Sequence, residues 1–408
     1  MLLITRGVIL WGKITMNRYK TLIGLIFSIF LLMAGQGMIA VLLPERILEL
    51  ALSESSAGYL ASTFALTYIL VQVPLGRISD RHAFKPFIMA GYLLIVSAGA
   101  IYHFAGSPVV LFLGRMVQGM GEAPLWALAP ALLSIQFPAV KGRVFGLYNA
   151  ALALGLTVGP LLTLGIQNRA CKEYLFLVFA AMALTGAVLV WLLVREDDHS
   201  GHPHTRFRYS HLFQQLKRSN VRDILTGVFL YGGGYGLLIS IIPAFLLQTK
   251  GLDQTGAGLY FTLIFFSMGL SQLLAGPLID RWGAGWFMTG GLVLTGSGFW
   301  AFPGLSGLWI HLSLLTIGLG LGIFGVTSLV YLNNQADRDH KGEISGLYYL
   351  VWGLGYLGLP LAGVHLGQAL GLGLFFRFCA GLSLLAAILS GLAQHRDRRR
   401  PGQRARIR

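Results

Sequence analysis

Apolar runs long enough to cross a bilayer recur along this whole sequence, and they constrain the fold more than any other feature. A transmembrane helix needs roughly 20 predominantly apolar residues. We place twelve such runs at 21–43, 56–78, 86–105, 108–136, 142–166, 173–194, 222–247, 255–279, 285–302, 307–334, 342–368 and 371–393. The runs lack the alternation of apolar and polar residues that marks a membrane β-strand. Only 12% of the 408 residues are charged, about half the share found in water-soluble proteins. The sequence therefore predicts an all-α membrane protein with twelve transmembrane helices.

The distribution of positive charge predicts how these helices are oriented. If the amino terminus is cytoplasmic, 25 of the 31 Lys and Arg residues fall in cytoplasmic segments, 4 in external loops and 2 in the spans. Such an excess is the positive-inside bias. We therefore expect both termini, the N-terminal segment 1–20 and the basic tail 394–408, to be cytoplasmic. We interpret the tail as a topology anchor that also contacts anionic lipid, rather than as a nucleic-acid-binding segment.

The two halves of the sequence repeat at an offset of 200 residues. Asp80 and Arg81 recur as Asp280 and Arg281, and the pattern Lys-Gly-x-x-x-Gly-Leu-Tyr at 141–148 recurs at 341–348. We therefore predict two pseudo-symmetric six-helix bundles, 21–194 and 222–393, joined by a cytoplasmic linker at 195–221. Transporters are often built from such repeats, with the substrate site at the repeat interface near the middle of the membrane. The glycine run 231–236 predicts a close or bendable stretch in the seventh span.

Three motifs resemble those of the major facilitator superfamily, and the resemblance covers about 20–395. "GRISDRHAFK" resembles the signature of the loop between spans two and three, with Ala83 and Phe84 departing from the usual Gly and Arg. "LFLGRMVQGMGEA" is similar to the fourth-span signature. "ALGLTVGPLLTLG" is similar to the fifth-span motif of the drug–proton antiporters, except at Thr163 and Leu164. The matching residues are Gly76, Asp80, Arg81, Lys85, Arg115, Gln118, Gly119, Gly121, Gly155, Gly159 and Pro160.

The resemblance implies a conformational latch in the repeated loops. Asp80 would contact the start of span eleven, near 342–346, and Asp280 the start of span five, near 142–146, because a carboxylate is attracted to a helix N-terminus. Closing these contacts would shut the cytoplasmic side. The alternative is that Asp-Arg only sets topology and caps helices. The residues assigned to the latch are Gly76, Asp80, Arg81, Lys85, Gly276, Asp280 and Arg281.

The fourth span carries the most informative chemistry. Arg115, Gln118 and Glu122 are spaced i, i+3 and i+7, so they share one helix face, and Trp126 extends it. Glu122 is the only one of the 16 acidic residues in the middle of a span. Ionisable residues at this depth usually face a cavity and mark ion or substrate paths. Our hypothesis is that Glu122 carries a proton or pairs with a cationic substrate group, while Arg115 tunes it or contacts an anionic group. The alternative is a structural ion pair or hydrogen-bond network.

Other polar and aromatic residues in the spans are weaker candidates for lining the cavity, and for each of the aromatic ones helix packing is at least as good an explanation. They are Gln36, Asn149, Tyr231, Tyr235, Gln272, Trp352 and Tyr356. The second half has no acidic residue or Lys in the middle of a span, so its cavity wall should be apolar and aromatic. This asymmetry favours a hydrophobic or amphipathic substrate.

Together these patterns predict a secondary active transporter that works by alternating access, with proton-coupled efflux of hydrophobic or amphipathic small molecules as the first hypothesis. An organic-anion or metabolite transporter of the same fold is the second, and a non-transporting scaffold or sensor is a remote third. There is no Walker-type Gly-x-x-x-x-Gly-Lys-Ser/Thr loop and no pair of metal-binding histidines on a span. We therefore expect no ATP use, enzyme activity, cofactor or metal, and no nucleic acid partner. We expect a monomer in a prokaryotic inner membrane, with a small-molecule substrate, protons and membrane lipids as partners.

Overall fold

The chain folds into long helices that follow the predicted spans. The computed structural model describes residues 16–51, 54–79, 82–163, 169–196, 219–250, 254–335 and 341–398. The first half forms α2 (Met16–Ala51), α3 (Glu54–Ser79), α4 (Phe84–His103), α5 (Pro108–Gln136), α6 (Lys141–Leu161) and α7 (Arg169–Leu193). The second forms α9 (Ser219–Ile239), α10 (Ile241–Gln248), α11 (Gln254–Trp282), α12 (Ala284–Ala301), η1 (Phe302–Gly304), α13 (Leu308–Gln335), α14 (Lys341–Leu370) and α15 (Leu372–Arg398). Over these ranges the all-α prediction is confirmed.

Eight of the described helical segments are apolar over a length sufficient to cross a membrane. In the seventh span, α9 passes unbroken through the glycine run 231–236, and the helix is interrupted only at Ser240. A Cβ added at Gly236 would lie 2.5 Å from the carbonyl oxygen of Tyr356 on α14. The glycines therefore allow close packing rather than a bend. The N-terminal segment, most of the linker and the end of the basic tail lie outside the described residues.

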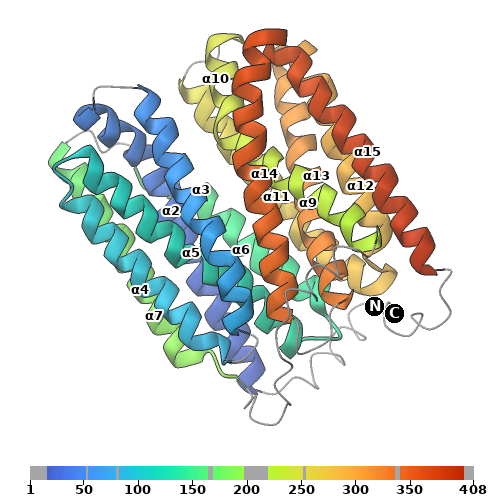
Figure 1. Cartoon of the computed structure of the whole chain (residues 1–408), viewed down its shortest axis with the longest axis horizontal. Helices are drawn as coiled ribbons and strands as arrows, with labels where there is room; N and C mark the ends of the chain where they lie inside the picture. The colour runs from blue at the N-terminus through green and yellow to red at the C-terminus, as the bar shows by residue number, and fades with distance from the viewer. Residues whose placement is uncertain are drawn as a thin grey trace.

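Each half packs its six long helices in the same pattern. In the first half α2 packs on α6 and α7, and α5 packs on α3 and α4. In the second half α9 packs on α14 and α15, and α13 packs on α11 and α12, which are the equivalent pairs. Figure 1 shows the halves as two bundles, one blue to green and one yellow to red. The predicted pair of pseudo-symmetric six-helix bundles is confirmed.

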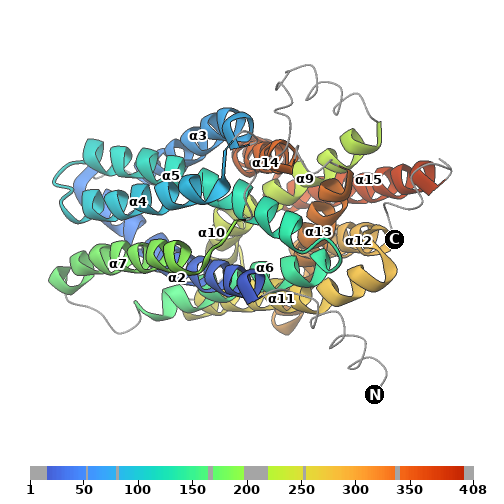
Figure 2. The ribbon, with the colours of Figure 1, turned by 90° about the horizontal axis from the view of Figure 1, so that it is seen from below.

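Two seams join the bundles, and they too are equivalent: α6 packs on α11, and α3 packs on α14. Figure 2 shows these seams at opposite edges of the molecule. Between them, α5 packs on α14 and α13 packs on α6. The helix that carries the fourth-span motif therefore lies at the interface between the bundles.

The helix ends next to the linker share one side of the molecule, which we call the linker side. Here Asp223, near the start of α9, forms a 3.1 Å ion pair with Arg396 near the end of α15. The carbonyl of Arg195, just after α7, accepts a 2.6 Å hydrogen bond from Gln136 at the end of α5. In Figure 1 this side is at the bottom, and the bundles diverge toward the top, which we call the far side.

Candidate functional site

One face of α5 presents the side chains of Arg115, Gln118, Glu122 and Trp126 toward the interior. Gln118 is fully buried and Glu122 is 1% exposed. A buried polar group is stable only when hydrogen bonds replace the water it loses. The partners of these two side chains therefore determine what the site can do.

Gln118 is the centre of a hydrogen-bond network that draws on three helices. Its Oε1 accepts from the Tyr102 hydroxyl of α4 (2.5 Å) and from Arg115 Nη1 (3.0 Å). Its Nε2 donates to Gln36 Oε1 of α2 (2.6 Å) and to Glu122 Oε1 (2.8 Å). The amide thus uses both of its donors and two acceptor positions. Its own orientation is fixed, and it holds Glu122 in place.

Glu122 is held by neutral donors. Besides Gln118, it accepts a 3.2 Å hydrogen bond at Oε2 from the indole Nε1–H of Trp126. Arg115 turns away toward α3, where its Nε donates to the carbonyl of Leu60 (3.4 Å) and its guanidinium lies 4.8 Å from the centre of the Phe64 ring. Within the described residues, Arg115 reaches Glu122 only through Gln118, so the arrangement is a network and not a direct ion pair.

Trp352 of α14 is the centre of an aromatic cluster opposite Glu122. It stacks on Trp126 with ring centroids 5.7 Å apart and on Tyr356 at 5.3 Å. It forms edge-to-face pairs with Tyr235 of α9 and Tyr68 of α3, with ring centroids 5.5 and 6.3 Å away. We call the second-bundle part of this cluster the aromatic wall; it consists of Tyr231, Tyr235, Tyr349, Trp352 and Tyr356.

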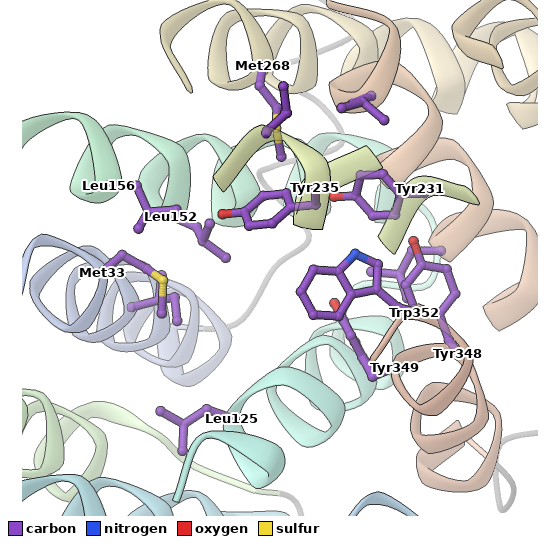
Figure 3. Close-up of a cluster of buried hydrophobic side chains, with 14 of the residues drawn as sticks. Met33, Leu125, Leu152, Leu156, Tyr231, Tyr235, Met268, Tyr348, Tyr349 and Trp352 are labelled. Atoms are coloured by element: carbon purple, nitrogen blue, oxygen red, sulfur yellow. The ribbon is translucent and has the colours of Figure 1, made fainter. Parts of the chain in front are cut away.

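The first bundle faces this wall with aliphatic side chains. Figure 3 shows Met33 of α2, and Leu152 and Leu156 of α6, on one side, with the tyrosines and Trp352 opposite. We call these three the aliphatic wall, and all three are buried. Leu125 of α5 lies instead against Gly91 of α4, within the first bundle. Tyr235 points its hydroxyl toward this wall.

The two walls share two equivalent positions of the 200-residue repeat. Leu152 and Leu156 correspond to Trp352 and Tyr356. The polar face of α5 has no polar counterpart on α13, where Gly322 takes the place of Glu122 and packs against Ser271 of α11. The interface therefore combines one charged, hydrogen-bonded face with apolar and aromatic surfaces.

Two further polar candidates lie away from this network. Asn149 is buried on α6, and its Nδ2 donates to the carbonyl of Phe145 one turn earlier (2.9 Å). Gln272 is 1% exposed on α11, where its backbone carbonyl lies against Gly146 at the seam between α6 and α11. Their described contacts are those of packing positions.

The second-half loop motif lies against the other bundle on the linker side. Asp280 accepts hydrogen bonds from the backbone N–H groups of Gly142 (2.6 Å) and Arg143 (2.8 Å), at the N-terminus of α6. Next to it, Lys141 Nζ donates to Asn334 Oδ1 of α13.

The other two latch residues of the second half have different surroundings. A Cβ at Gly276 would lie 2.5 Å from the Gly142 carbonyl oxygen, so the crossing of α6 and α11 requires glycine. Arg281 instead lies over the Trp282 ring, at 5.6 Å.

The first-half motif is only partly described. Asp80 and Arg81 lie outside the described residues, as do the surroundings of Gly76. Lys85 makes its contacts within the first bundle, where Nζ donates to the carbonyls of Trp191 (2.8 Å) and Val194 (2.9 Å) at the end of α7. In return, Glu196 accepts from the backbone N–H groups of Phe84 and Lys85 at the start of α4.

The fifth-span motif packs α6 against α2. A Cβ at Gly155 would lie 2.5 Å from the Phe30 carbonyl oxygen, and Gly159 lies against Ala34. Pro160 packs against Gly37, where an added Cβ would lie 2.9 Å from the proline ring. In this structure these three residues bring two helices of the first bundle together.

Sequence reasoning missed Tyr102, Tyr349 and the aliphatic wall. Tyr349, Trp352 and Tyr356 are spaced i, i+3 and i+7, so the sequence did contain a signal for Tyr349 on the face of Trp352. Tyr102 and the aliphatic wall gave no such signal, because their roles depend on which helices pack together.

Comparison with known proteins finds one matching family model and several similar transport proteins. The family model of the Major Facilitator Superfamily matches residues 25–253 and 224–408. The class C tetracycline resistance protein of Escherichia coli is 26% identical over 348 residues, covering 81% of this chain and 85% of that protein. The proton-coupled antiporter flippase LtaA of Staphylococcus haemolyticus is 22% identical over 333 residues, covering 78% of this chain and 80% of that protein. The crystal structure of the human organic anion transporter MFSD10 superposes with a TM-score of 0.80 at 16% identity, covering 91% of this chain and 99% of that protein.

Proposed function

Because this chain belongs to the Major Facilitator Superfamily, we propose that it is a secondary active transporter that exports hydrophobic or amphipathic small molecules in exchange for protons. The two bundles would alternate around a site between Glu122 and the two walls. The linker side would face the cytoplasm, which agrees with the excess of Lys and Arg in the segments of that side.

The position of Glu122 is the observation that carries this proposal. Its carboxyl group is buried at the bundle interface and is held by Gln118 and Trp126, both uncharged. A carboxyl group in such surroundings can exist with or without its proton, since no cation bonds it directly within the described residues. A carboxyl group that gains and loses a proton as the site opens to each side can couple transport to a proton gradient.

The walls support an amphipathic substrate. Trp352 and its neighbours offer flat aromatic surfaces, while Met33, Leu152 and Leu156 offer aliphatic ones. Such surfaces bind apolar groups without requiring specific hydrogen bonds. A positively charged group on the substrate would gain from Glu122 and from the faces of the aromatic rings. The names of the tetracycline resistance protein and of the proton-coupled antiporter flippase are consistent with export of such molecules.

Arg115 favours a second candidate function, the transport of an organic anion. Its described partners are the neutral Gln118 and Leu60 and the ring of Phe64. Among the described residues, no carboxylate contacts its guanidinium directly. An anionic group that reached this depth would find a guanidinium able to bind it.

The test uses purified protein in liposomes with an acidic lumen. Uptake of a fluorescent lipophilic cation, a neutral amphipathic molecule and an organic anion is measured with the gradient intact and after a protonophore collapses it. We expect the gradient to accelerate uptake of the cation or the neutral molecule at least several-fold, and a Trp352→Leu variant to transport them more slowly. Uptake at the same rate with and without the proton gradient, or gradient-driven uptake of the anion alone, would contradict export by proton exchange.

A further inference from the structure

Trp126 belongs both to the Glu122 network and to the aromatic cluster. Its indole N–H donates to Glu122 Oε2 over 3.2 Å. Its ring stacks on Trp352 with centroids 5.7 Å apart and planes inclined by 20°, and it contacts Tyr349 at 5.7 Å. Since α5 lies in one bundle and α14 in the other, this single side chain connects the buried carboxyl group of one half to the interface with the other.

We propose that Trp126 is a positioning residue that couples the protonation state of Glu122 to the contact between the two bundles. This inference rests on the proton-coupled export proposed above and assigns the coupling step to a specific side chain.

The physical basis is the difference between an ionised and a neutral acceptor. A hydrogen bond to a carboxylate is roughly twice as strong as one between neutral groups. When Glu122 takes up a proton, it therefore holds the indole less firmly, and the ring is freer to leave its stack on Trp352. By linkage, a movement of α14 that draws the indole away also changes the proton affinity of Glu122.

The stack can transmit this change because Trp352 contacts several helices. Tyr68 of α3 lies 6.3 Å from it and Tyr235 of α9 lies 5.5 Å from it, centroid to centroid. The α3–α14 seam passes the same point, since Gly353 packs against Tyr68 and Ile69. A shift of the Trp126–Trp352 stack would therefore change the packing of α3 against α14 at the seam.

Of the charged and titratable groups around Trp126, only Glu122 is expected to change its charge near neutral pH. Arg115 lies on the same helix, and the phenols of Tyr68, Tyr102, Tyr235 and Tyr356 face Glu122 from α3, α4, α9 and α14. A guanidinium stays charged at all ordinary pH values, and a phenol in water loses its proton only near pH 10, about three units above neutrality.

The test measures distances between spin labels at Gly106→Cys and Ser306→Cys, with Cys171 replaced by Ser. Both positions are exposed, they are equivalent in the repeat, and they lie on the far side. In the wild-type site, we expect the distance distribution at acidic pH to differ from that at alkaline pH. Trp126→Phe keeps an aromatic ring but loses the N–H, and we expect its shift with pH to be at least about fivefold smaller.

Trp352→Leu keeps the N–H of Trp126 but removes the stack, so it should reduce the shift in distance with pH in the same way. The double variant Trp126→Phe/Trp352→Leu should show a shift no smaller than that of either single variant. Trp309→Phe, at a side chain that is 65% exposed, is the matched control and should respond like the wild type. A purely structural role for Trp126 would change the distances equally at every pH. A full pH response in Trp126→Phe and Trp352→Leu would overturn the inference and leave the proposed function intact. No pH response in the wild type, or a full one in Glu122→Gln, would instead contradict the proposed function.

Discussion

Gln118 holds the charged groups of the site apart. Its amide lies between the guanidinium of Arg115 and the carboxyl group of Glu122, and it also fixes Tyr102 and Gln36. A direct Arg115–Glu122 pair would keep Glu122 ionised through most of the physiological pH range, because a cation in contact favours the charged form. The bridging amide keeps Arg115 one side chain away, so proton exchange at Glu122 stays possible.

Replacing Gln118 by Met should therefore destabilise the protein markedly. Met has a similar volume, but it leaves the buried Tyr102 and Glu122 each without one partner, and each unsatisfied buried group costs about 1–3 kcal/mol. We expect a fall of several degrees in the thermal unfolding midpoint, measured by intrinsic fluorescence in detergent. Asn149→Leu is the matched control, since that amide bonds only to Phe145 of its own helix in the described contacts, and its fall should be smaller. Equal falls would contradict the network.

At the level of helices, α6 and α11 meet through a helix N-terminus and a carboxylate. Asp280 accepts the N–H groups of Gly142 and Arg143, which an isolated helix leaves unsatisfied. Hydrogen bonds that involve a charged group each contribute about 1.5–3 kcal/mol. The contact joins the bundles on the linker side, so its loss should favour separation there.

Asp280→Leu should therefore open the linker side. With spin labels at His82→Cys and Trp282→Cys, which are equivalent positions of the repeat, we expect the population of longer distances to rise at least about tenfold, since a loss of about 1.4 kcal/mol is sufficient for that change. Asp223→Leu is the control, because Asp223 pairs with Arg396 inside one bundle. It should lower stability without changing the distances. Unchanged distances in Asp280→Leu would exclude a latch at this contact.

The helices and the α5 face could be predicted because both depend on spacing within one segment. Twelve apolar runs and a 200-residue repeat are sufficient for the two bundles, and a 3.6-residue period places Arg115, Gln118 and Glu122 on one face. The aliphatic wall could not be predicted, since Leu152 at the interface and a leucine facing lipid look alike in sequence. The contacts of Lys85 with the end of α7 also depended on tertiary packing, because the two segments are more than 100 residues apart.

At the scale of the whole molecule, the bundles are joined on the linker side and diverge toward the far side (Figure 1). If they alternate around the central site, opening one side should close the other. We expect substrates or pH changes that lengthen the His82–Trp282 label distance to shorten the Gly106–Ser306 distance in the same sample. Both distances lengthening together would indicate loosening of the bundles instead of alternating access.

Proton coupling at Glu122 is tested most directly by transport with Glu122→Gln in liposomes, where gradient-driven uptake and substrate exchange are measured on the same preparation. Gln keeps the size of the side chain and removes its titratable group. We predict that gradient-driven uptake falls at least about tenfold, while exchange of the neutral amphipathic substrate for itself, which needs neither net proton movement nor the Glu122 charge, continues within a few-fold of the wild type. A Glu122→Gln protein that retained full gradient-driven transport would contradict Glu122 as the proton carrier.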